Sequence, residues 1–509
     1  MIGPERRRTV YLLGIDIGTS STKSAVFDTK GNILGLAAQE YVFETSRPGY
    51  AEQDPEDWWK AVVISVRNAV RVSGVSQDEI VAIGLSGQMH GMVPLDLKGQ
   101  VIRKAILHCD VRAAEEVEEI KKEFGHEYES ITFNPVFPGF QAVSLYWLRK
   151  WEPESYRKLY RVVCPKDYIR YRMTGKIGTE HTDASGTLLY DMKKSVWSPE
   201  LFQMLELDMS IVPREIARSY EIAGNLTKEA AEQLGLSGNT LVAYGGADQA
   251  MQSVGNGIYQ AGTTMATIGT SGQVLRISNI PVYNQDMNTH TFRHVNDNTW
   301  YGLGALLFAG STLNWFRRNF CEDQSYEDLS TLAAAVSPGS DGLVFFPCMG
   351  GERTPYLDPK AKGMFCGLTM VHNKAHFARA IMEGISFEMK LSIEKIESLY
   401  GLAEKCVCAG GGVKGSVWPQ IQADIYNKDI SISAIKEQAC LGAAIMAGIG
   451  AGVFSDMRDA CESMCDRLMT VVSPNEENSE KYQWLYKEVF RQLYESNAKA
   501  FHKINDFTE

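Results

Sequence analysis

The sequence lacks a long apolar run, and it lacks any extended tract of positive charge. No stretch approaches the roughly 18 apolar residues that a membrane span needs, so a membrane protein is not expected. The longest basic run is Arg6-Arg7-Arg8, and 51 Lys and Arg residues against 62 Asp and Glu give a net charge of -11. This balance disfavours nucleic acid and anionic membranes as partners.

Paired cysteine motifs are also missing, although ten cysteines are present. The closest spacings, Cys406-x-Cys408 and Cys461-x3-Cys465, do not form the C-x-x-C pairs of a structural zinc site. Scattered thiols are typical of a reducing cytosol. The arginines near the start precede an apolar run of only about five residues, which contains Asp16 and no small-residue cleavage site. We therefore expect a cytoplasmic protein without an export signal.

What the chain has is length and apolar content. Its 509 residues, 44% of them hydrophobic, are too many for one ordinary core, so we expect two large domains with a cleft between them. The Ile-Gly-Thr-Ser of residues 17–20 is repeated at residues 268–271, with Thr267 at the position of Asp16. This echo indicates two related halves, residues 1–256 and 257–509, although so short an echo can also arise by chance.

Strand and helix signals alternate along both halves. Residues 11–40 are typical of an antiparallel meander, residues 57–72 have helical spacing, and residues 80–87 form an apolar strand that ends on glycine. We further expect a buried strand at 240–249, a strand from 263, helices at 305–320 and 374–400, and a last helix near 480–500. This order predicts an α/β fold.

Two glycine-containing turns are candidate phosphate cradles, because small residues let backbone N–H groups turn toward an anion. The turns are Gly18-Thr19-Ser20 and Gly269-Thr270-Ser271; neither is a Walker A loop. Lys23 follows the first turn, where its ammonium group could offset phosphate charge, and Asp16 at the strand end could orient Mg²⁺ through water. An ordinary hairpin with a capping aspartate is the alternative.

A carboxylate and a glycine run follow two of the apolar strands. The segment Gly-Gly-Ala-Asp-Gln at 245–249 places Asp248 where a helix would begin, a position that can hold a general base beside a substrate. Asp248 could equally be a helix N-cap. The triple glycine at 410–412 would let a nucleotide lie close to the backbone, but it is also a common hinge. The motif Ser-Gly-Gln-Met-His-Gly at 86–91 ends another strand, and its lone His90 is often a structural residue in such a setting.

Taken in order, these segments make the chain resemble the FGGY carbohydrate kinases from about residue 13 to residue 446. The matching motifs are GIDIGTSSTK, YAEQDPEDWW, SGQMHG, PGF, PKDYIRYRMTG, DASGT, GGADQ, IGTSG, GGERTP, GLT and GGG. The resemblance implies two duplicated ribonuclease-H-like domains of the actin and hexokinase type. It also implies phosphorylation of a sugar by ATP with Mg²⁺. Members that act on xylulose are the most similar, so D-xylulose, converted to D-xylulose 5-phosphate, is the expected substrate.

The resemblance also implies roles for individual residues. Asp248 occupies the position of the family's catalytic base, and Asp16 and Asp248 occupy the positions implied to bind the metal ion. The substrate-binding set is Gln88, Met89, His90, Asp110, Arg112, Asp248 and Gln249. The ATP-binding set is Gly18, Thr19, Ser20, Lys23, Gly269, Thr270, Ser271, Gly310, Asn314, Gly411, Gly412 and Ser416. In-line transfer with domain closure that expels water is the implied mechanism, and a homodimer is a family-level expectation.

Two departures from the family pattern alter the expected pocket. Where members that act on xylulose read Trp-Asn-Asp-Gly-Arg, residues 108–112 read His-Cys-Asp-Val-Arg, and the usual lysine after the PGF motif is Ser144. Another ketose or polyol, such as ribulose, erythritol, glycerol or gluconate, is therefore an alternative substrate. A catalytically degenerate sugar sensor and an actin- or chaperone-like ATPase are alternative functions. Retention of Asp16 and Asp248 argues against the sensor, and the acid of GGADQ argues against the ATPase.

Overall fold

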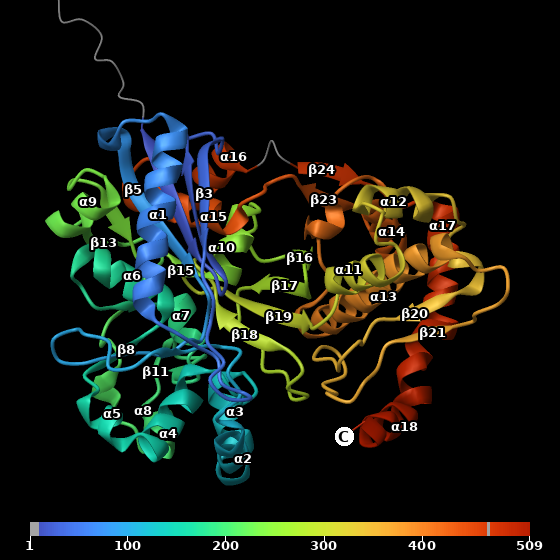
Figure 1. Ribbon diagram of the computed structural model, residues 1–509, viewed down its shortest axis with the longest axis horizontal. Coiled ribbons are helices and arrows are strands. Elements are labelled where there is room, and N and C mark those ends of the chain that lie inside the picture. The colour runs from blue at the N-terminus through green and yellow to red at the C-terminus, as the bar shows by residue number, and fades with distance from the viewer. Residues whose placement is uncertain (1–9, 466–468, 509) are drawn as a thin grey trace, which may run out of the picture. The chain divides into compact units, whose positions relative to one another are not determined.

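The computed structural model describes residues 10–465 and 469–508 of the chain. It contains two compact units, drawn in Figure 1. Unit 1 comprises the described residues of Met1–Tyr259, Phe292–Trp300 and Glu437–Arg467, and unit 2 those of Gln260–Thr291, Tyr301–Lys436 and Leu468–Glu509. The units therefore exchange short segments of chain, and a segment late in the sequence completes unit 1.

Unit 1 is built on a seven-stranded sheet with the order β13-β14-β5-β1-β2-β3, with β15 also pairing with β5. β1 pairs antiparallel with β2 and parallel with β5, and β2 pairs antiparallel with β3, so the predicted meander is confirmed. The strands are β1 (Tyr11–Ile17), β2 (Ser21–Phe27), β3 (Ile33–Glu40), β5 (Ile80–Gly87), β13 (Ile222–Asn225), β14 (Leu241–Ala243) and β15 (Gly246–Ala247).

The sheet of unit 2 repeats this arrangement, with the order β18-β19-β17-β16-β22-β23-β24. β16 pairs antiparallel with β17 and parallel with β22, as β1 does with β2 and β5. The strands are β16 (Thr263–Ile268), β17 (Gly272–Ser278), β18 (His290–Arg293), β19 (Trp300–Leu306), β22 (Lys405–Gly410), β23 (Ile430–Ser433) and β24 (Met469–Val472). The predicted duplicated α/β fold is confirmed.

Helix α1 (Pro55–Ser73) covers one face of the first sheet, and Figure 1 shows it running along β3. The Asp54 side chain accepts from Glu56 N at the start of the helix, and Gly74, with a φ of 67°, ends it. Trp58 of α1 packs in one apolar cluster with Leu13 and Ile15, which share a face of β1 because alternate residues of a strand point the same way.

The opposite face of the first sheet is covered by α15 (Gln438–Gly450), which packs on β1 and β5. A Cβ on Gly14 would lie 1.8 Å from the carbonyl oxygen of Cys440, and one on Gly84 would lie 1.8 Å from that of Ala443. These glycines let the helix approach the strands closely. α10 (Asp248–Gly255) packs beside α15 and completes this layer.

The remaining helices of unit 1 lie mainly between β5 and β14 in the chain. They are α2 (Ala114–Glu123), α3 (Gly125–Thr132), α4 (Gln141–Trp151), α5 (Pro153–Lys158), α6 (Pro165–Thr174), α7 (His181–Ser185), α8 (Pro199–Met204), α9 (Lys228–Leu234) and α16 (Met457–Met464). Short strands link them: β4 (Glu52–Gln53), β6 (Val93–Leu95), β7 (Ala105–Ile106), β8 (Arg161–Val163), β9 (Thr179–Glu180), β10 (Tyr190–Asp191), β11 (Val196–Trp197) and β12 (Ile216–Ala217).

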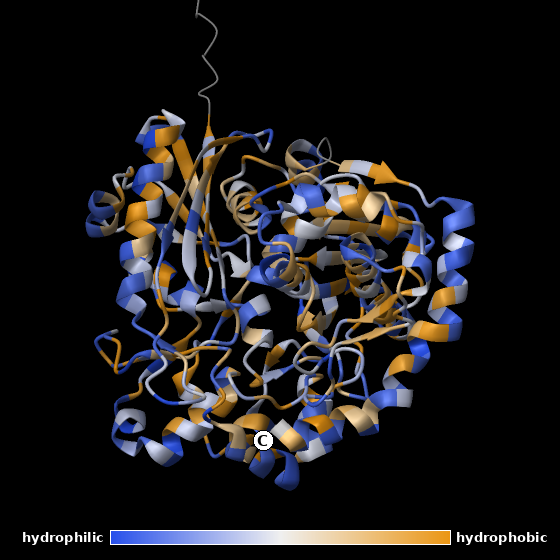
Figure 2. Ribbon diagram, turned by 45° about the vertical axis from the view of Figure 1, so that its right-hand side comes forward, coloured by the Kyte–Doolittle hydropathy of each residue, from blue (hydrophilic) through white to orange (hydrophobic). Residues whose placement is uncertain are grey.

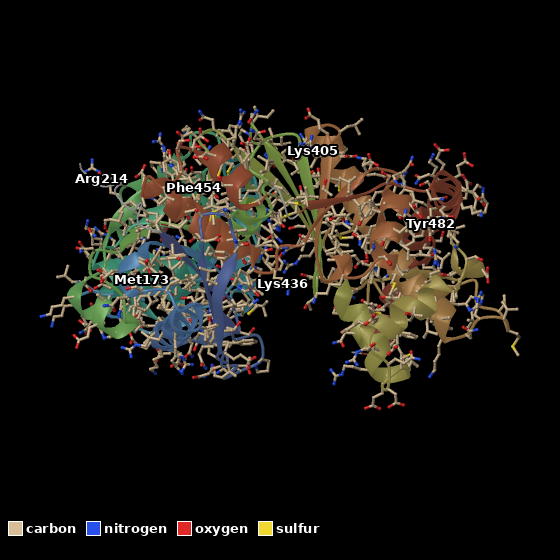
Figure 3. All side chains as sticks on the ribbon, turned by 90° about the horizontal axis from the view of Figure 1, so that it is seen from above. Met173, Arg214, Lys405, Lys436, Phe454 and Tyr482 are labelled. Atoms are coloured by element: carbon tan, nitrogen blue, oxygen red, sulfur yellow. The ribbon has the colours of Figure 1, made fainter. Side chains whose placement is uncertain are left out.

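The core of unit 2 is organised by α13 (Lys374–Tyr400), which has the predicted bounds. Tyr482, labelled in Figure 3, is buried and donates to Glu383 Oε1 at 2.6 Å, which ties the C-terminal helices to α13. The other elements are α11 (Gly310–Phe320), α12 (Tyr326–Ala334), β20 (Val344–Phe346), β21 (Met364–Cys366), α14 (Val417–Tyr426), α17 (Glu476–Leu485) and α18 (Arg491–Thr508).

The predicted helix at 305–320 begins later than expected, because β19 extends to Leu306 and α11 starts at Gly310. Figure 2 shows that α1 and α18 each carry both hydrophilic and hydrophobic residues. Within the part of the chain that the structure describes, none of the helices combines the length and the apolar character needed to cross a bilayer.

Candidate active site

Asp16 lies near the end of β1, between the two neighbouring strands that carry other candidate residues. It is opposite Lys23 on β2 and opposite Ser86 on β5. Ser86 Oγ donates to Asp16 Oδ1 at 2.7 Å. The carboxylate is thus held by a side chain of the parallel strand rather than by the turn that follows β1, which distinguishes it from the capping aspartate of an ordinary hairpin.

Asp248 lies near the carboxyl end of β5, which is also the end of that strand beside which Asp16 lies. Gly245 has a φ of 73°, and a Cβ added to it would lie 2.0 Å from Leu85 O. The chain bends at this glycine, so the strand predicted at 240–249 is divided into β14 and β15. β15 pairs with β5 at Ser86 and Gly87, and α10 begins directly afterwards. The N-cap of α10 is Ala247, so Asp248 is the first residue of the helix and not its cap.

The pKa values of both carboxyl groups are raised, and the charge of Asp16 contributes to the shift at Asp248. Burial and the charge of Asp16 raise the pKa of Asp248 to about 7. Burial also raises the pKa of Asp16, although Ser86 and Lys23 oppose the shift. Paired carboxylate oxygens are the ligands that hard divalent cations such as Mg²⁺ and Ca²⁺ prefer, and a cation beside them would relieve their repulsion. The residues present therefore fit a divalent metal ion.

The turn between β1 and β2 is fixed by hydrogen bonds within unit 1. Gly18 O accepts from Tyr41 Oη at 2.6 Å, and Thr19 O accepts from Gln53 Nε2 at 2.7 Å. The Ser20 carbonyl accepts from Tyr41 N, and the Ser20 side chain is exposed. Because the carbonyl groups are used inside the protein, the turn is held in one conformation.

Lys23 lies on β2, three residues beyond Ser20 of the turn. Its ammonium group pairs with Glu437 Oε2 at 3.0 Å, and its side chain remains 41% exposed. Glu437 precedes α15, so this pair also joins the last segment of unit 1 to the sheet. This partner could not be predicted from the sequence, since 413 residues separate the two positions in the chain.

The loop after β5 carries the residues predicted to bind sugar. Gln88 is buried and donates to Gly18 O at 3.4 Å, while its Oε1 is buried without a hydrogen-bond donor. Met89 is buried as well. His90 has a φ of 71°, and its Nδ1 lies 2.7 Å from Gly186 O. Since a carbonyl oxygen can only accept, Nδ1 carries the proton, and the neutral ring has its acceptor at Nε2.

Asp110 and Arg112 form a closed pair. Arg112 Nη2 lies 2.7 Å from Asp110 Oδ2, and Ala51 N donates to the same oxygen at 2.6 Å. The guanidinium group also pairs with Glu52 at 2.8 Å and stacks on the ring of Tyr50 at 3.8 Å. Both side chains are 1% exposed, so the pair stiffens its segment of unit 1.

Gln249, the second residue of α10, is buried, and its Oε1 has no hydrogen-bond donor. Its backbone N–H donates to Asp248 Oδ1 at 2.7 Å. Gln249 and Gln88 therefore both bring unpartnered amide oxygens to the part of unit 1 that holds Asp248, where hydroxyl groups of a ligand could donate to them.

In unit 2 the turn after β16 is joined to the start of α11. Gly310 N donates to Gly269 O at 2.8 Å, and the backbone N–H groups of Ala309 and Ser311 donate to Thr270 O at 3.1 Å. A Cβ on Gly310 would lie 2.4 Å from Gly269 O, so only glycine allows this approach. Ser271 closes the turn, because its carbonyl accepts from Gly269 N at 2.9 Å.

The glycine run after β22 lies at the same edge of the second sheet, because Gly410 is opposite Ile268 in the parallel pair. Gly411 and Gly412 form a 3-10 turn, which leads to Ser416 before α14. Asn314 lies on α11, one turn beyond Gly310. The candidate nucleotide residues of unit 2 therefore gather at the carboxyl ends of β16 and β22, where parallel sheets commonly bind ligands.

A hollow of about 600 Å³ adjoins α11 in unit 2. Its lining includes Ser311, Asn314, Trp315 and Arg318. Trp315 and Arg318 were not predicted from the sequence. An aromatic ring and a guanidinium group are groups on which a planar base can stack, but a tryptophan on an amphipathic helix gives no such signal before the fold is known.

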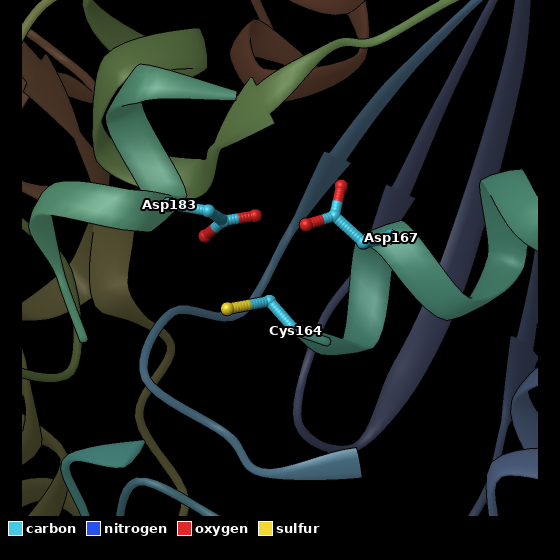
Figure 4. A group of neighbouring side chains, drawn as sticks. All are labelled: Cys164, Asp167 and Asp183. Carbon is cyan, nitrogen blue, oxygen red and sulfur yellow. The ribbon is translucent and has the colours of Figure 1, made fainter. Parts of the chain in front are cut away.

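Two clusters of acidic and thiol groups lie apart from Asp16 and Asp248. Figure 4 shows Cys164, Asp167 and Asp183 of unit 1 around a common point, with ligand atoms within 4.8 Å of one another. Lys166 Nζ lies within this cluster, 2.7 Å from Asp167 and 3.2 Å from Asp183. A lysine thus supplies the positive charge, and we assign no metal to this cluster.

The second cluster comprises Cys348, Glu352 and Glu388 of unit 2, all buried. Cys348 Sγ donates to Glu388 Oε1 at 3.2 Å, and Glu352 Oε1 accepts from Leu307 N at 2.7 Å. Burial raises the pKa of Glu352 to about 7 and the pKa of Glu388 well above its usual range. Protonation therefore lowers the negative charge that would attract a cation.

Comparison with known proteins identifies both halves of the sequence. Residues 11–255 match the N-terminal domain of the FGGY family of carbohydrate kinases, and residues 264–451 match its C-terminal domain. The xylulose kinase of Bacillus subtilis (strain 168) is 35% identical over 498 residues, which cover 97% of this chain and 99% of that protein.

Two solved structures from Lactobacillus acidophilus are similar to the whole chain. Ligand-bound xylulose kinase has a TM-score of 0.90 at 25% identity and covers 97% of this chain and 99% of its own. Gluconate kinase has the same TM-score and identity and covers 97% and 100%. Overall fold therefore does not distinguish these two sugar substrates.

Proposed function

Because this chain belongs to the FGGY family of carbohydrate kinases, we propose that it transfers the γ-phosphoryl group of ATP to D-xylulose, giving D-xylulose 5-phosphate. The observation that carries the proposal is Asp248, a partly buried carboxylate at the start of α10 whose pKa is raised to about 7 beside Asp16. The names of the similar full-length proteins support xylulose as the substrate.

In this reaction Asp248 accepts the proton of the attacking sugar hydroxyl. A carboxylate with a pKa near neutrality is a stronger base than an ordinary aspartate, yet it is still substantially ionised at the pH of the cytoplasm. Its place at the first turn of a helix that packs on α15 fixes the backbone from which the carboxylate extends. The ten cysteines are all free thiols, which supports the cytoplasmic location that we include in the proposal.

Sugar kinases of this family use ATP with a divalent metal ion, and we propose Mg²⁺ for this chain. Asp16 and Asp248 would hold it, and the ion, when bound, supplies positive charge beside the phosphate oxygens. The backbone of the two Gly-Thr turns and Lys23 would bind phosphate oxygens. The glycines of unit 2, Gly310 and Gly411, with Asn314 and Ser416, would bind the rest of the nucleotide.

The sugar side of the proposal rests on the loop after β5. Gln88 and Gln249 offer buried amide oxygens, and His90 offers an imidazole whose tautomer is fixed by Gly186. A buried acceptor distinguishes sugars by whether a hydroxyl reaches it, since a polar group left unpaired in such a site costs binding energy.

The altered residues lie beside this loop. A Cβ on Gly139 would lie 2.1 Å from His108 O, and the next residue, Phe140, has its ring centroid 4.0 Å from that of His90. His108 is therefore placed against the segment that packs on His90. Cys109 is exposed, whereas Ser144 is buried in α4. This neighbourhood is the specific reason to keep another ketose, a polyol or gluconate as the second candidate substrate.

The test is ADP release with Mg·ATP against D-xylulose, L-xylulose, D-ribulose, L-ribulose, glycerol, erythritol and gluconate. We expect D-xylulose to give the highest kcat/KM, with little ADP release when sugar is omitted. A higher value for another member would keep the kinase and reassign its substrate. ADP release that is independent of every sugar, and that persists in Asp248→Asn, would contradict the proposed function.

A further inference from the structure

The short helix α7 is hydrogen-bonded at both of its ends to segments that carry proposed active-site residues. Near its start, Thr182 Oγ1 accepts from Ala247 N at 2.8 Å. Just after its end, the Gly186 carbonyl accepts from His90 Nδ1 at 2.7 Å. A single rigid turn of helix thus connects the residue before the proposed base with the proposed sugar-binding histidine.

The hydrogen bond that Ala247 N donates to Thr182 fixes the backbone immediately before Asp248. Ala247 is the N-cap of α10, and its N–H is not used by the helix itself. β15 also pairs with the end of β5, at Ser86 and Gly87, and the preceding Gly245 N donates to Ser219 O at 2.9 Å. The Thr182 hydroxyl therefore adds a side-chain hydrogen bond from α7 to the segment that carries the proposed base.

The direction of the Thr182 hydroxyl is set by Glu180. Thr182 Oγ1 donates to Glu180 Oε1 at 2.8 Å, so its lone pairs are left to face Ala247. Glu180 is fully buried and caps α7 by accepting from the backbone N–H of Asp183 at 2.9 Å. Ser219 Oγ donates to the other carboxylate oxygen at 3.2 Å. Each oxygen of Glu180 is thus fixed, and the threonine hydroxyl has one favoured orientation.

The buried charge of this region is balanced by Lys166. Its Nζ lies 3.6 Å from Glu180 Oε1 and also donates to Tyr244 O at 3.3 Å, in the segment that leads to Asp248. Burial opposes its charge, but the three surrounding carboxylates outweigh burial and raise the pKa of Lys166. A Cβ on Gly87 would lie 2.9 Å from Lys166 Cβ, so the lysine also packs against the end of β5.

We propose that Thr182, oriented by Glu180 and by the Lys166 cluster, is a positioning residue that fixes Asp248 at a set distance from the sugar-binding loop at His90. This inference rests on the proposed function, in which Asp248 is the base. Displacing a catalytic group by about 1 Å can lower turnover by about a hundredfold, so the loss of this single tether should be visible in kcat.

The test is Thr182→Val, which keeps the shape of the side chain and removes the hydroxyl. We expect kcat to fall at least about tenfold, with KM for ATP changed by less than about threefold. Thr182→Ser, which restores the hydroxyl, should recover most of kcat. The acidic limb of the pH profile should move in the valine variant and return in the serine variant, because the environment of Asp248 changes only in the first.

Thr240→Val is the matched control. Thr240 is equally buried and donates to Ile80 O at 3.0 Å, at the other end of β5. Its loss removes one buried hydrogen bond, whereas Thr182→Val removes two, so Thr240→Val should lower the unfolding temperature by less than Thr182→Val does and should leave kcat within about twofold. If Thr182→Val does not fold, Ser219→Ala, which removes one of the two hydrogen bonds to Glu180 Oε2, should lower kcat in the same direction.

Two results separate the failure of this inference from the failure of the proposed function. If Asp248→Asn abolishes turnover while Thr182→Val keeps kcat and the pH profile of the parent protein, Asp248 remains the base and the positioning role is wrong. If Asp248→Asn keeps normal turnover, the base assignment fails, and the positioning role fails with it. Equal losses of kcat in Thr182→Val and Thr240→Val would also overturn the inference, because they would report a general loss of stability.

Discussion

Asp248 lies close enough to Asp16 for the charge of one carboxylate to raise the pKa of the other. Together with burial, this brings the pKa of Asp248 to about 7. Two anionic groups held together in a folded protein are costly unless a cation or a proton compensates them. The same pair that would bind a divalent metal ion therefore also makes the chain sensitive to pH in the neutral range.

We predict that kcat/KM for the sugar falls below pH 7, by about tenfold for each pH unit, because Asp248 must be ionised to accept a proton. A divalent cation bound beside the carboxylates favours their ionised form, so raising the concentration of Mg²⁺ should move this limb to lower pH. The measurement is initial rate from pH 5 to 9 at two fixed concentrations of free Mg²⁺. A profile that is flat through this range would contradict the assignment.

Stability should also depend on Asp248. Its folded-state pKa lies above the ordinary value of 3.8, so the favourable contribution of the protonated carboxyl is complete below about pH 4 and is lost as pH rises through about 7. Asp248→Asn removes the charge, and it should raise the free energy of unfolding at pH 8 by up to a few kcal/mol relative to the parent protein. At pH 4 the two should be nearly equal.

Urea unfolding at pH 4 and pH 8, without metal or nucleotide, measures this difference. The control is Asp78→Asn, a change at an exposed carboxyl of unit 1, which should alter stability little at either pH. A lower stability of Asp248→Asn at pH 8 would show that the ionised carboxylate is compensated in the free protein.

The same variant has a separate kinetic outcome. Asp248→Asn should lower kcat by about 10² to 10⁴-fold, the range for loss of a positioned base, while the sugar still binds. Asparagine keeps the shape of the side chain and an acceptor oxygen. Binding can be followed by calorimetry and turnover by ADP release. Near-normal turnover would remove Asp248 from the role of base.

The sequence predicted the elements with strong local signals. The helix at 374–400 has the predicted bounds, since apolar residues that recur with the helical period over so long a segment indicate a helix and not a strand. The start of α11 was missed, because the apolar residues up to Leu306 are too few to separate strand from helix, and the break before Gly310 is set by a contact with Gly269. Such a contact joins distant parts of the chain and has no local pattern.

The candidate site shows the same division. The two aspartates and the Gly-Thr turns stand at strand ends, where a sequence pattern indicates them, and the structure brings Asp16 and Asp248 together in unit 1. The partners that orient them could not be predicted. Thr182 and Ala247 are joined by one hydrogen bond across 65 positions of chain, and an isolated threonine gives no sign of it. The division of the sequence at residue 256, the binding roles of single residues and a homodimer stay predictions.

Gly310 offers a test of the nucleotide side that leaves unit 1 untouched. Because a Cβ there would lie 2.4 Å from Gly269 O, Gly310→Ala should push the turn after β16 away from the start of α11 and disturb the backbone proposed to bind phosphate. We expect KM for ATP to rise about tenfold or more, while the sugar binds unit 1 with unchanged affinity. Gly238→Ala is the control, since a Cβ at Gly238 would meet nothing within 4 Å. An unchanged KM for ATP in a folded Gly310→Ala would show that this turn does not bind the nucleotide, and a loss of sugar affinity would show that the substitution disturbs more than the turn.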